Sequence, residues 1–202
     1  MSSPVTSARP ARSRKVRAIL AGGVVLGVGA AVTLAAWSDS EFATGLFSAG
    51  SFNLEGSTNG AAYDEHPAAN APASLAFSLP LAQNLAPEET VYAPFAVRLD
   101  DSTTSPADVA LTVAGTTGVV AGLTYELIAT SSFGCDATTT GTTVVPAGTA
   151  LTAGTGSFDL AAGTAGVAGA PVNLCFAVSA DSTLAQGQSG AVTWQFAATS
   201  AN

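Results

Sequence analysis

Apolar and polar residues alternate in short runs along most of the chain beyond residue 40, which is the pattern of strands with one buried face. The clearest runs have an apolar residue at every second position, and they are Leu75–Leu79, Val91–Leu99, Val109–Val113, Leu123–Leu127, Val172–Val178 and Val192–Ala198. Phe52 and Leu54 predict a shorter strand, and weaker candidates are Val144–Val145 and Phe158–Leu160. This region shows no helical periodicity, so the chain is predicted to be all-β.

Clusters of turn-forming residues separate these runs, and they are Asp100–Ser102, Gly115–Gly118, Pro146–Gly148 and Gln186–Gly190. About eight short strands at this spacing predict a single β-sandwich, either a jelly roll or an immunoglobulin-like fold. Pro94 lies within one run and has no backbone N–H, so its strand is expected at a sheet edge or with the proline turned away from a neighbour. The stretch from Ser57 to Ala73 has no regular pattern and is predicted to be a long loop.

The N-terminal segment follows a different pattern. Five of the six Lys and Arg residues lie within the first 17 positions, and residues 18–36 carry no charge. A basic part, an apolar part and small residues at its end are the features of a secretory signal helix. The sequence predicts a signal peptide over residues 1–35, basic over 1–17 and apolar over 18–35, cleaved between Ala35 and Ala36. The alternative is a retained anchor, because the uncharged run is about long enough to span a bilayer.

Removal of the leader changes the charge of the protein. All fourteen Asp and Glu residues lie at or after Asp39, while Arg98 is the one Lys or Arg beyond residue 17. Residues 36–202 therefore have one positive and fourteen negative side chains, a net charge of −13. A domain this acidic does not attract nucleic acid or anionic lipid. We expect the full-length precursor in the plasma membrane, held only through its leader, and a secreted, extracellular or cell-surface domain over residues 36–202.

Cys135 and Cys175 are the two cysteines of the chain, and both lie in the part expected to be exported. An even pair in an oxidising compartment predicts a disulfide bond. Cys175 is out of phase with Leu174 and Phe176, so its side chain is expected on the face of its strand away from the main apolar set. That position suits a link to the loop that carries Cys135.

Residue types that carry catalysis are scarce. His66 is the single histidine and lies in the irregular segment, so the two-histidine pattern of zinc proteases cannot occur. A Ser-His-Asp triad would have to use His66, and the sequence has no glycine-flanked nucleophile motif. Adjacent carboxylates in an extended chain point to opposite faces, and Asp64–Glu65, Glu88–Glu89 and Asp100–Asp101 are interpreted as solvated turn charges. We predict a protein that is not an enzyme, without a catalytic, metal or cofactor site.

Aromatic residues offer one further option, a platform for stacking a carbohydrate. The candidates are Trp37, Tyr63, Tyr92, Tyr125 and Trp194. Tyr125 and Trp194 are in phase with the apolar faces of their strands, which favours packing in the core. Trp37 and Tyr63 are freer.

The junction from Leu34 to Leu54 reads LAAWSDSEFATGLFSAGSFNL. It resembles the leader and early mature region of proteins processed by the SipW-type signal peptidase, which include TasA and the camelysin group. Leu85–Glu89 resembles the L-x-P-G-D turn of these proteins, with Glu88 and Glu89 in place of Gly and Asp. The cysteine pair and the segment from Gln186 to Phe196 resemble the high-GC Gram-positive branch.

The resemblance implies a jelly-roll fold and a role in extracellular fibres or a biofilm matrix. It also implies a signal peptidase as partner during export, and self-association or other matrix proteins as later partners. For fibre formation we expect the early strand, with Phe47, Phe52 and Leu54, to be donated to the open sheet edge of a neighbouring copy. The alternatives are a camelysin-like extracellular metalloprotease and a cell-surface adhesin or carbohydrate-binding module.

Overall fold

The computed structural model describes residues 15–20, 40–45, 50–78 and 85–201. The chain divides into two units, Met1–Phe47 and Ser48–Asn202. In the first unit residues 15–20 are helical and residues 40–45 are irregular and exposed. None of the helical residues described there forms a helix long and apolar enough to cross a membrane. The predicted cleavage point between Ala35 and Ala36, and Phe47, lie outside the described residues.

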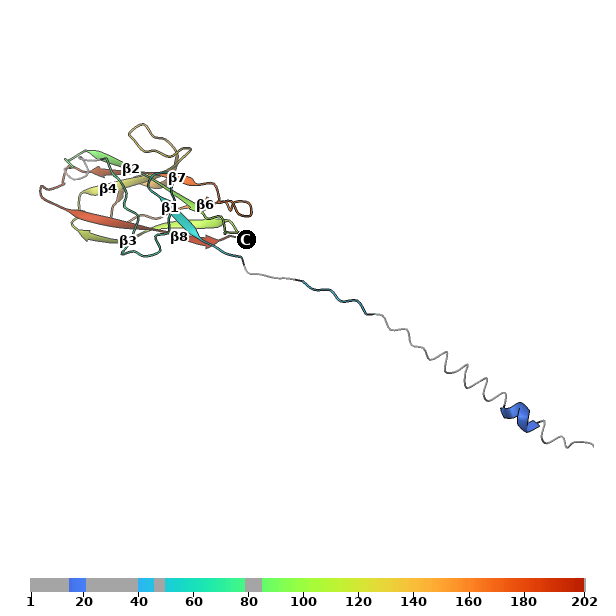
Figure 1. Ribbon diagram of the computed structural model, residues 1–202. Coiled ribbons are helices and arrows are strands. Elements are labelled where there is room, and N and C mark those ends of the chain that lie inside the picture. The colour runs from blue at the N-terminus through green and yellow to red at the C-terminus, as the bar shows by residue number, and fades with distance from the viewer. Residues whose placement is uncertain (1–14, 21–39, 46–49, 79–84, 202) are drawn as a thin grey trace, which may run out of the picture. The chain divides into compact units, whose positions relative to one another are not determined.

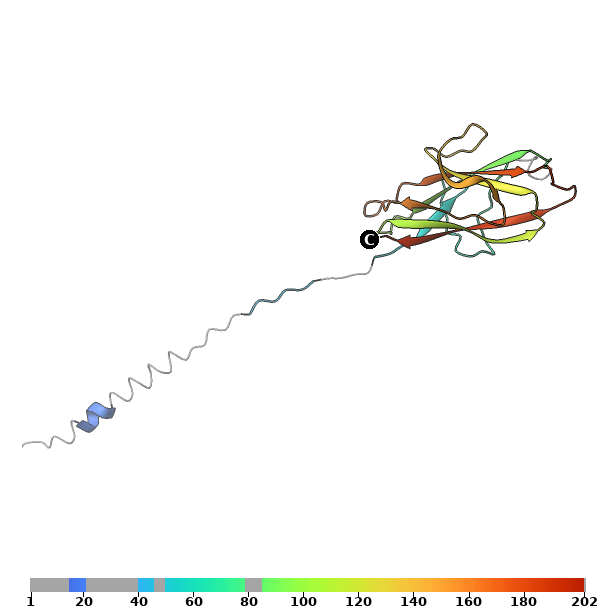
Figure 2. The same cartoon turned by 180° about the vertical axis from the view of Figure 1, so that it is seen from behind.

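The second unit is a sandwich of two antiparallel sheets, seen from opposite sides in Figures 1 and 2. Its strands are β1 (Leu54–Ser57), β2 (Thr90–Leu99), β3 (Ala107–Gly118), β4 (Leu123–Thr130), β5 (Thr142–Ala150), β6 (Gly156–Leu160), β7 (Val172–Ala180) and β8 (Gly190–Ser200). One sheet has the order β1-β2-β7-β4-β5, and the other has the order β6-β3-β8. The predicted all-β sandwich is confirmed.

The strand order distinguishes between the two predicted sandwich types. In a complete jelly roll the second, seventh, fourth and fifth strands form one sheet, and the first, eighth, third and sixth form the other. This chain has β2-β7-β4-β5 and β8-β3-β6 in those orders, so it is a jelly roll. Its first strand is displaced, because β1 pairs with β2 instead of β8. The place beside β8 is therefore unoccupied in the part of the chain that the structure describes.

Period-2 alternation places the core between the sheets. The inward residues of the five-stranded sheet are mostly aliphatic, whereas β8 contributes aromatic rings. Trp194 and Phe196 of β8 pack against Phe176 of β7, with ring centroids 4.6 Å and 6.4 Å from the Phe176 ring. Tyr125 is almost fully buried beside Trp194, with a centroid distance of 5.6 Å. The two sheets are thus joined through one aromatic cluster.

Several sequence-based expectations need correction. The run Leu75–Leu79 forms no strand over its described residues, although Leu75 and Phe77 pack on the core. The early strand was expected over residues 47–54, but the ladder begins at Leu54 and ends at Ser57. The cluster Gly115–Gly118 forms the last four residues of β3, which continues past a bulge at Ala114, and the cluster Pro146–Gly148 is a bulge within β5.

Pro94 was expected at a sheet edge or turned away from a neighbouring strand, and it lies where β2 has a strand partner on one side only. Strand β2 has a neighbour on each side, but β1 pairs only with the stretch from Ala96 to Leu99. Pro94 therefore lies beyond the end of β1, opposite Cys175 of β7. No described strand pairs with this part of β2 on the β1 side, where Ser78 bonds only to Tyr92, so the missing N–H of Pro94 breaks no ladder there.

Candidate functional site: an apolar cleft along the last strand

A cleft of about 940 Å³ runs between the two sheets along β8. One wall is the inner face of β8 with Val192, Trp194 and Phe196, and the other is formed by β1 and β2. Residues from His66 to Phe77 line it as well. Much of this lining is apolar, so the cleft presents a strip of hydrophobic surface at the open side of the sandwich.

The opposite side of the sandwich is closed. Strands β5 and β6 approach so closely that a Cβ atom added at Gly156 would lie 2.5 Å from the Val144 carbonyl oxygen. On the open side, β8 pairs with β3 alone among the described strands. Its other backbone edge faces the jelly-roll position that no described strand fills. The same wall contains a buried polar atom, Nε1 of Trp194, which approaches Tyr125 but makes no well-formed hydrogen bond among the described residues.

Strand β1 is held on β2 by a polar clamp. The Arg98 guanidinium donates from Nε and Nη2 to Oε2 of Glu55, at 3.0 Å each. The guanidinium carbon also lies 4.0 Å from the ring centroid of Tyr63, which adds a cation–π contact. Burial raises the pKa of Tyr63. The clamp thus uses the single cation beyond residue 17 to join β1, β2 and the loop after β1.

The outer edge of β1 is also occupied. Gly56 and Asp64 exchange two backbone hydrogen bonds of 2.9 and 3.0 Å. Just upstream of β1, the backbone N–H of Asn53 donates to Thr103 Oγ1 at 2.8 Å, and the Asn53 side chain donates to Glu65 at 2.7 Å. Thr103 donates in turn to Asp100, and this bond is the main cause of the lowered pKa of Asp100. These contacts fix the chain from Asn53 onwards.

The predicted donor residues therefore fall into three different situations. Leu54 lies in β1 opposite Leu99 of its own chain. Phe52 is 38% exposed and lines the cleft, next to a bridge between Ser51 and Thr103. Phe47 lies outside the described residues. Further upstream, the side chain of Phe42 is 92% exposed.

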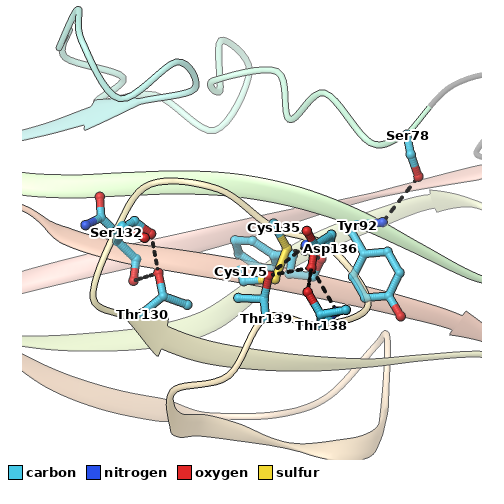
Figure 3. The surroundings of a disulfide bond; sticks show 11 residues. Ser78, Tyr92, Thr130, Ser132, Cys135, Asp136, Thr138, Thr139 and Cys175 are labelled. Atoms are coloured by element: carbon cyan, nitrogen blue, oxygen red, sulfur yellow. Dashed lines mark hydrogen bonds between the residues drawn. A yellow bond between two sulfur atoms is a disulfide. The ribbon is translucent and has the colours of Figure 1, made fainter.

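Figure 3 shows the disulfide bond between Cys135 and Cys175, which confirms the predicted pair. Cys175 lies on the outer face of β7, opposite Pro94 on one side and Ile128 on the other. The loop of residues 131–141, here called the disulfide loop, lies across this face. Its Phe133 also packs on the turn after β1, since a Cβ atom at Gly60 would lie 2.5 Å from the Phe133 ring.

The remaining sequence candidates lie apart from one another. His66 is exposed in the loop that lines the cleft, and the described residues contain no group of three or more His, Cys, Asp or Glu placed to hold a metal ion. Glu88 and Glu89 lie in the turn before β2. Tyr125 and Trp194 pack in the core as expected, Tyr63 belongs to the clamp, and Tyr92 faces outward from β2. Trp37 lies outside the described residues.

Alternation in the sequence marked β8 as a strand, but it could not show that none of the described strands pairs with its outer edge. That outcome depends on where β1 pairs, which is a long-range choice. Neither the family models nor the curated proteins contain a match to this chain.

Proposed function

We propose that the protein is a secreted structural protein of an extracellular matrix, whose copies polymerise when the segment before Ser48 adds as a strand beside β8 of the next copy. The observation that carries the proposal is the edge of β8 at which no described strand pairs, together with the apolar cleft beside it. Such an edge is a template for strand addition.

The segment that precedes the compact unit suits this position in length. Residues 36–47 would extend over about 40 Å as a strand, and the eleven residues of β8 extend over about 36 Å. The segment also has the right chemistry, since Phe42 and Phe47 are large apolar residues separated by small ones. Burial of both rings contributes about 3–6 kcal/mol, in addition to the ladder hydrogen bonds.

The clamp determines which part of the chain is available. Because Leu54 to Ser57 are fixed on β2 and Asn53 is fixed by Thr103, the donated segment ends before them. The proposed donor therefore lies upstream of the strand proposed from the sequence alone. Addition of one copy to the next is head-to-tail, so it gives open filaments and not closed rings.

Export is part of the proposal. The basic and apolar leader supports secretion, and the disulfide bond fits an oxidising compartment. After cleavage before Ala36, the donor segment becomes the free N-terminus of the mature chain. Processing thereby converts a tethered precursor into a subunit that can polymerise.

The test compares chain 36–202 with chain 48–202 by electron microscopy and light scattering. We expect filaments from the longer chain and monomers from the shorter one. A synthetic peptide of residues 36–47 should bind to chain 48–202, whereas the same peptide with Phe42→Ser and Phe47→Ser should not. Monomers from both chains at high concentration, or filaments from both, would refute strand donation.

A pair of matched variants tests the acceptor. Val192→Glu places a charge in the cleft and should abolish polymerisation of chain 36–202. Val119→Glu places the same charge at an exposed position and should leave polymerisation intact. Equal polymerisation of the two variants would show that the cleft is not the acceptor.

A further inference from the structure

The outer face of the five-stranded sheet has a second cavity, of about 270 Å³, beside the disulfide loop. Its floor is Ala177 of β7, which pairs with Tyr92 of β2 on one side and with Glu126 of β4 on the other. Residues opposite one another on adjacent strands project from the same face. Tyr92 and Glu126 therefore stand on either side of the space above a single methyl group.

Two walls enclose this space. Strand β5 places three residues, Pro146–Gly148, opposite the single residue Glu126, so its backbone bulges next to that side chain. Ala147 and Gly148 of this bulge line the cavity. The disulfide loop supplies Asp136 and Thr139, and Figure 3 shows Asp136 beside the bonded cysteines. The covalent bond from Cys135 to β7 holds this wall in position.

The polar groups around the cavity have free hydrogen-bonding capacity. The Glu126 carboxylate and the Tyr92 hydroxyl have no hydrogen-bond or ion-pair partner in the described part of the chain. Asp136 accepts through Oδ1 from Thr138 and Thr139, and Oδ2 takes no part in those bonds. The same bonds lower the pKa of Asp136, so it is ionised at neutral pH.

We propose that this cavity binds a single neutral saccharide ring, as one unit of an extracellular glycan. Carboxylate oxygens form short, strong bonds with hydroxyl donors, and the carboxylates of Glu126 and Asp136 can each take one or two sugar hydroxyls. The Tyr92 ring supplies an apolar surface for the C–H face of the sugar. The hydroxyls of Thr90 and Ser179, 2.8 Å apart, line the remaining side.

Other ligand classes fit less well. Among the residues that the structure describes, no cationic side chain lines the cavity to neutralise an anionic ligand. The described residues provide no three-ligand group for a metal ion. A cationic side chain would use the two carboxylates but would leave the hydroxyl side unused. The volume admits one ring and not an extended chain, so the glycan must be recognised at an end or at a projecting unit.

The test uses chain 48–202, which contains every strand and the disulfide, and is independent of strand donation. Methyl glycosides of glucose, mannose and galactose are titrated to about 50 mM while backbone amide NMR signals are recorded. At least one sugar should shift the amides of Ala177, Gly148 and Thr139, with a dissociation constant in the millimolar range. No shift with any sugar, or shifts confined to other residues, would overturn the proposal.

Variants and a competing ligand sharpen the test. Glu126→Gln and Tyr92→Leu should each weaken binding about tenfold while leaving the rest of the spectrum unchanged. Asp159→Asn, an exposed carboxylate on β6 of the other sheet, serves as the matched control and should bind as the parent does. Nα-acetyl-lysine methylamide is titrated in parallel. Shifts with this amine alone would overturn the saccharide assignment in favour of a cation site.

Discussion

Removal of the disulfide is expected to reduce the stability of the compact unit strongly. The perturbation is the double variant Cys135→Ala, Cys175→Ala. The two cysteines are 40 residues apart in the sequence, and the chain-entropy model assigns a loop of this length about 13 cal/mol/K, which is about 4 kcal/mol at 25 °C. Domains of this size are stable by about 5–15 kcal/mol, so the bond accounts for a large fraction of the total.

The double variant removes few contacts from the folded state. Cys175 is only 2% exposed, and its main partners, Pro94 and Ile128, are retained in the variant. Most of the effect should therefore come from the unfolded chain, which expands once the link is gone. This predicts a second change, an increase in the denaturant dependence of the unfolding free energy, because more surface is exposed on unfolding.

Urea unfolding of chain 48–202, followed by tryptophan fluorescence, measures both quantities. The control is the parent chain treated with a thiol reductant, which should match the double variant. A loss below about 1 kcal/mol with an unchanged slope would refute the reasoning, since it would mean that the disulfide loop adds no constraint to the unfolded chain.

Three further predictions concern single residues. Gly56→Ala should cost about 1–3 kcal/mol, because the new Cβ would lie 2.6 Å from Cζ of Phe95, and adding Phe95→Leu should recover part of the loss in urea unfolding. Glu88→Gly should raise the thermal midpoint, with a gain of about 0.5–1 kcal/mol, because Glu88 has φ 66°, a conformation that glycine adopts without steric cost. The pKa of Asp100 is lower in the folded state than its usual 3.8, so its stabilisation is present above about pH 4 and is lost as the pH falls through the folded value. Thr103→Val should make this acid loss shallower in unfolding measured from pH 5 to 2, and an unchanged slope would contradict that assignment.

The sequence predicted the strands better than their partners. Alternation identified Val91–Leu99 and Val172–Val178 correctly, because both strands have one face in the core along their whole length. The same alternation misled at Leu75 and Phe77, whose side chains are partly buried although their backbone joins no ladder. Periodicity reports which side chains are buried, and it does not report whether the backbone finds a neighbour.

The candidate sites depend on contacts that no local pattern contains. Strand β1 includes Gly56, and glycine is a poor strand former. At this position the Phe95 ring occupies the space that a side chain would need, so the absence of a side chain lets β1 pair with β2. The cavity beside the disulfide loop exists because Pro146–Gly148 bulge within β5, a stretch that the sequence presents as a turn. The cysteine pair was predictable because a chain with two cysteines offers one intramolecular pairing.

The turn Leu85–Glu89 could be predicted in part, through its resemblance to the L-x-P-G-D turn. Glu88 stands where the L-x-P-G-D pattern has glycine, and it adopts the positive φ that glycine favours after Pro87. The local geometry thus agrees with the pattern even though the residue does not.

The clamp around Arg98 also determines how the protein meets proteases. Enzymes of trypsin specificity cut after Lys or Arg, and residues 18–202 offer them only the bond between Arg98 and Leu99. That bond lies in β2 where β1 covers one side, and Leu99 is completely buried. A protease must bind its substrate as a free extended segment, so cleavage there requires β1 to detach and β2 to open. In a medium rich in such enzymes, the folded protein would therefore resist cleavage. The rate of cleavage after Arg98 would measure how often β1 detaches and β2 opens.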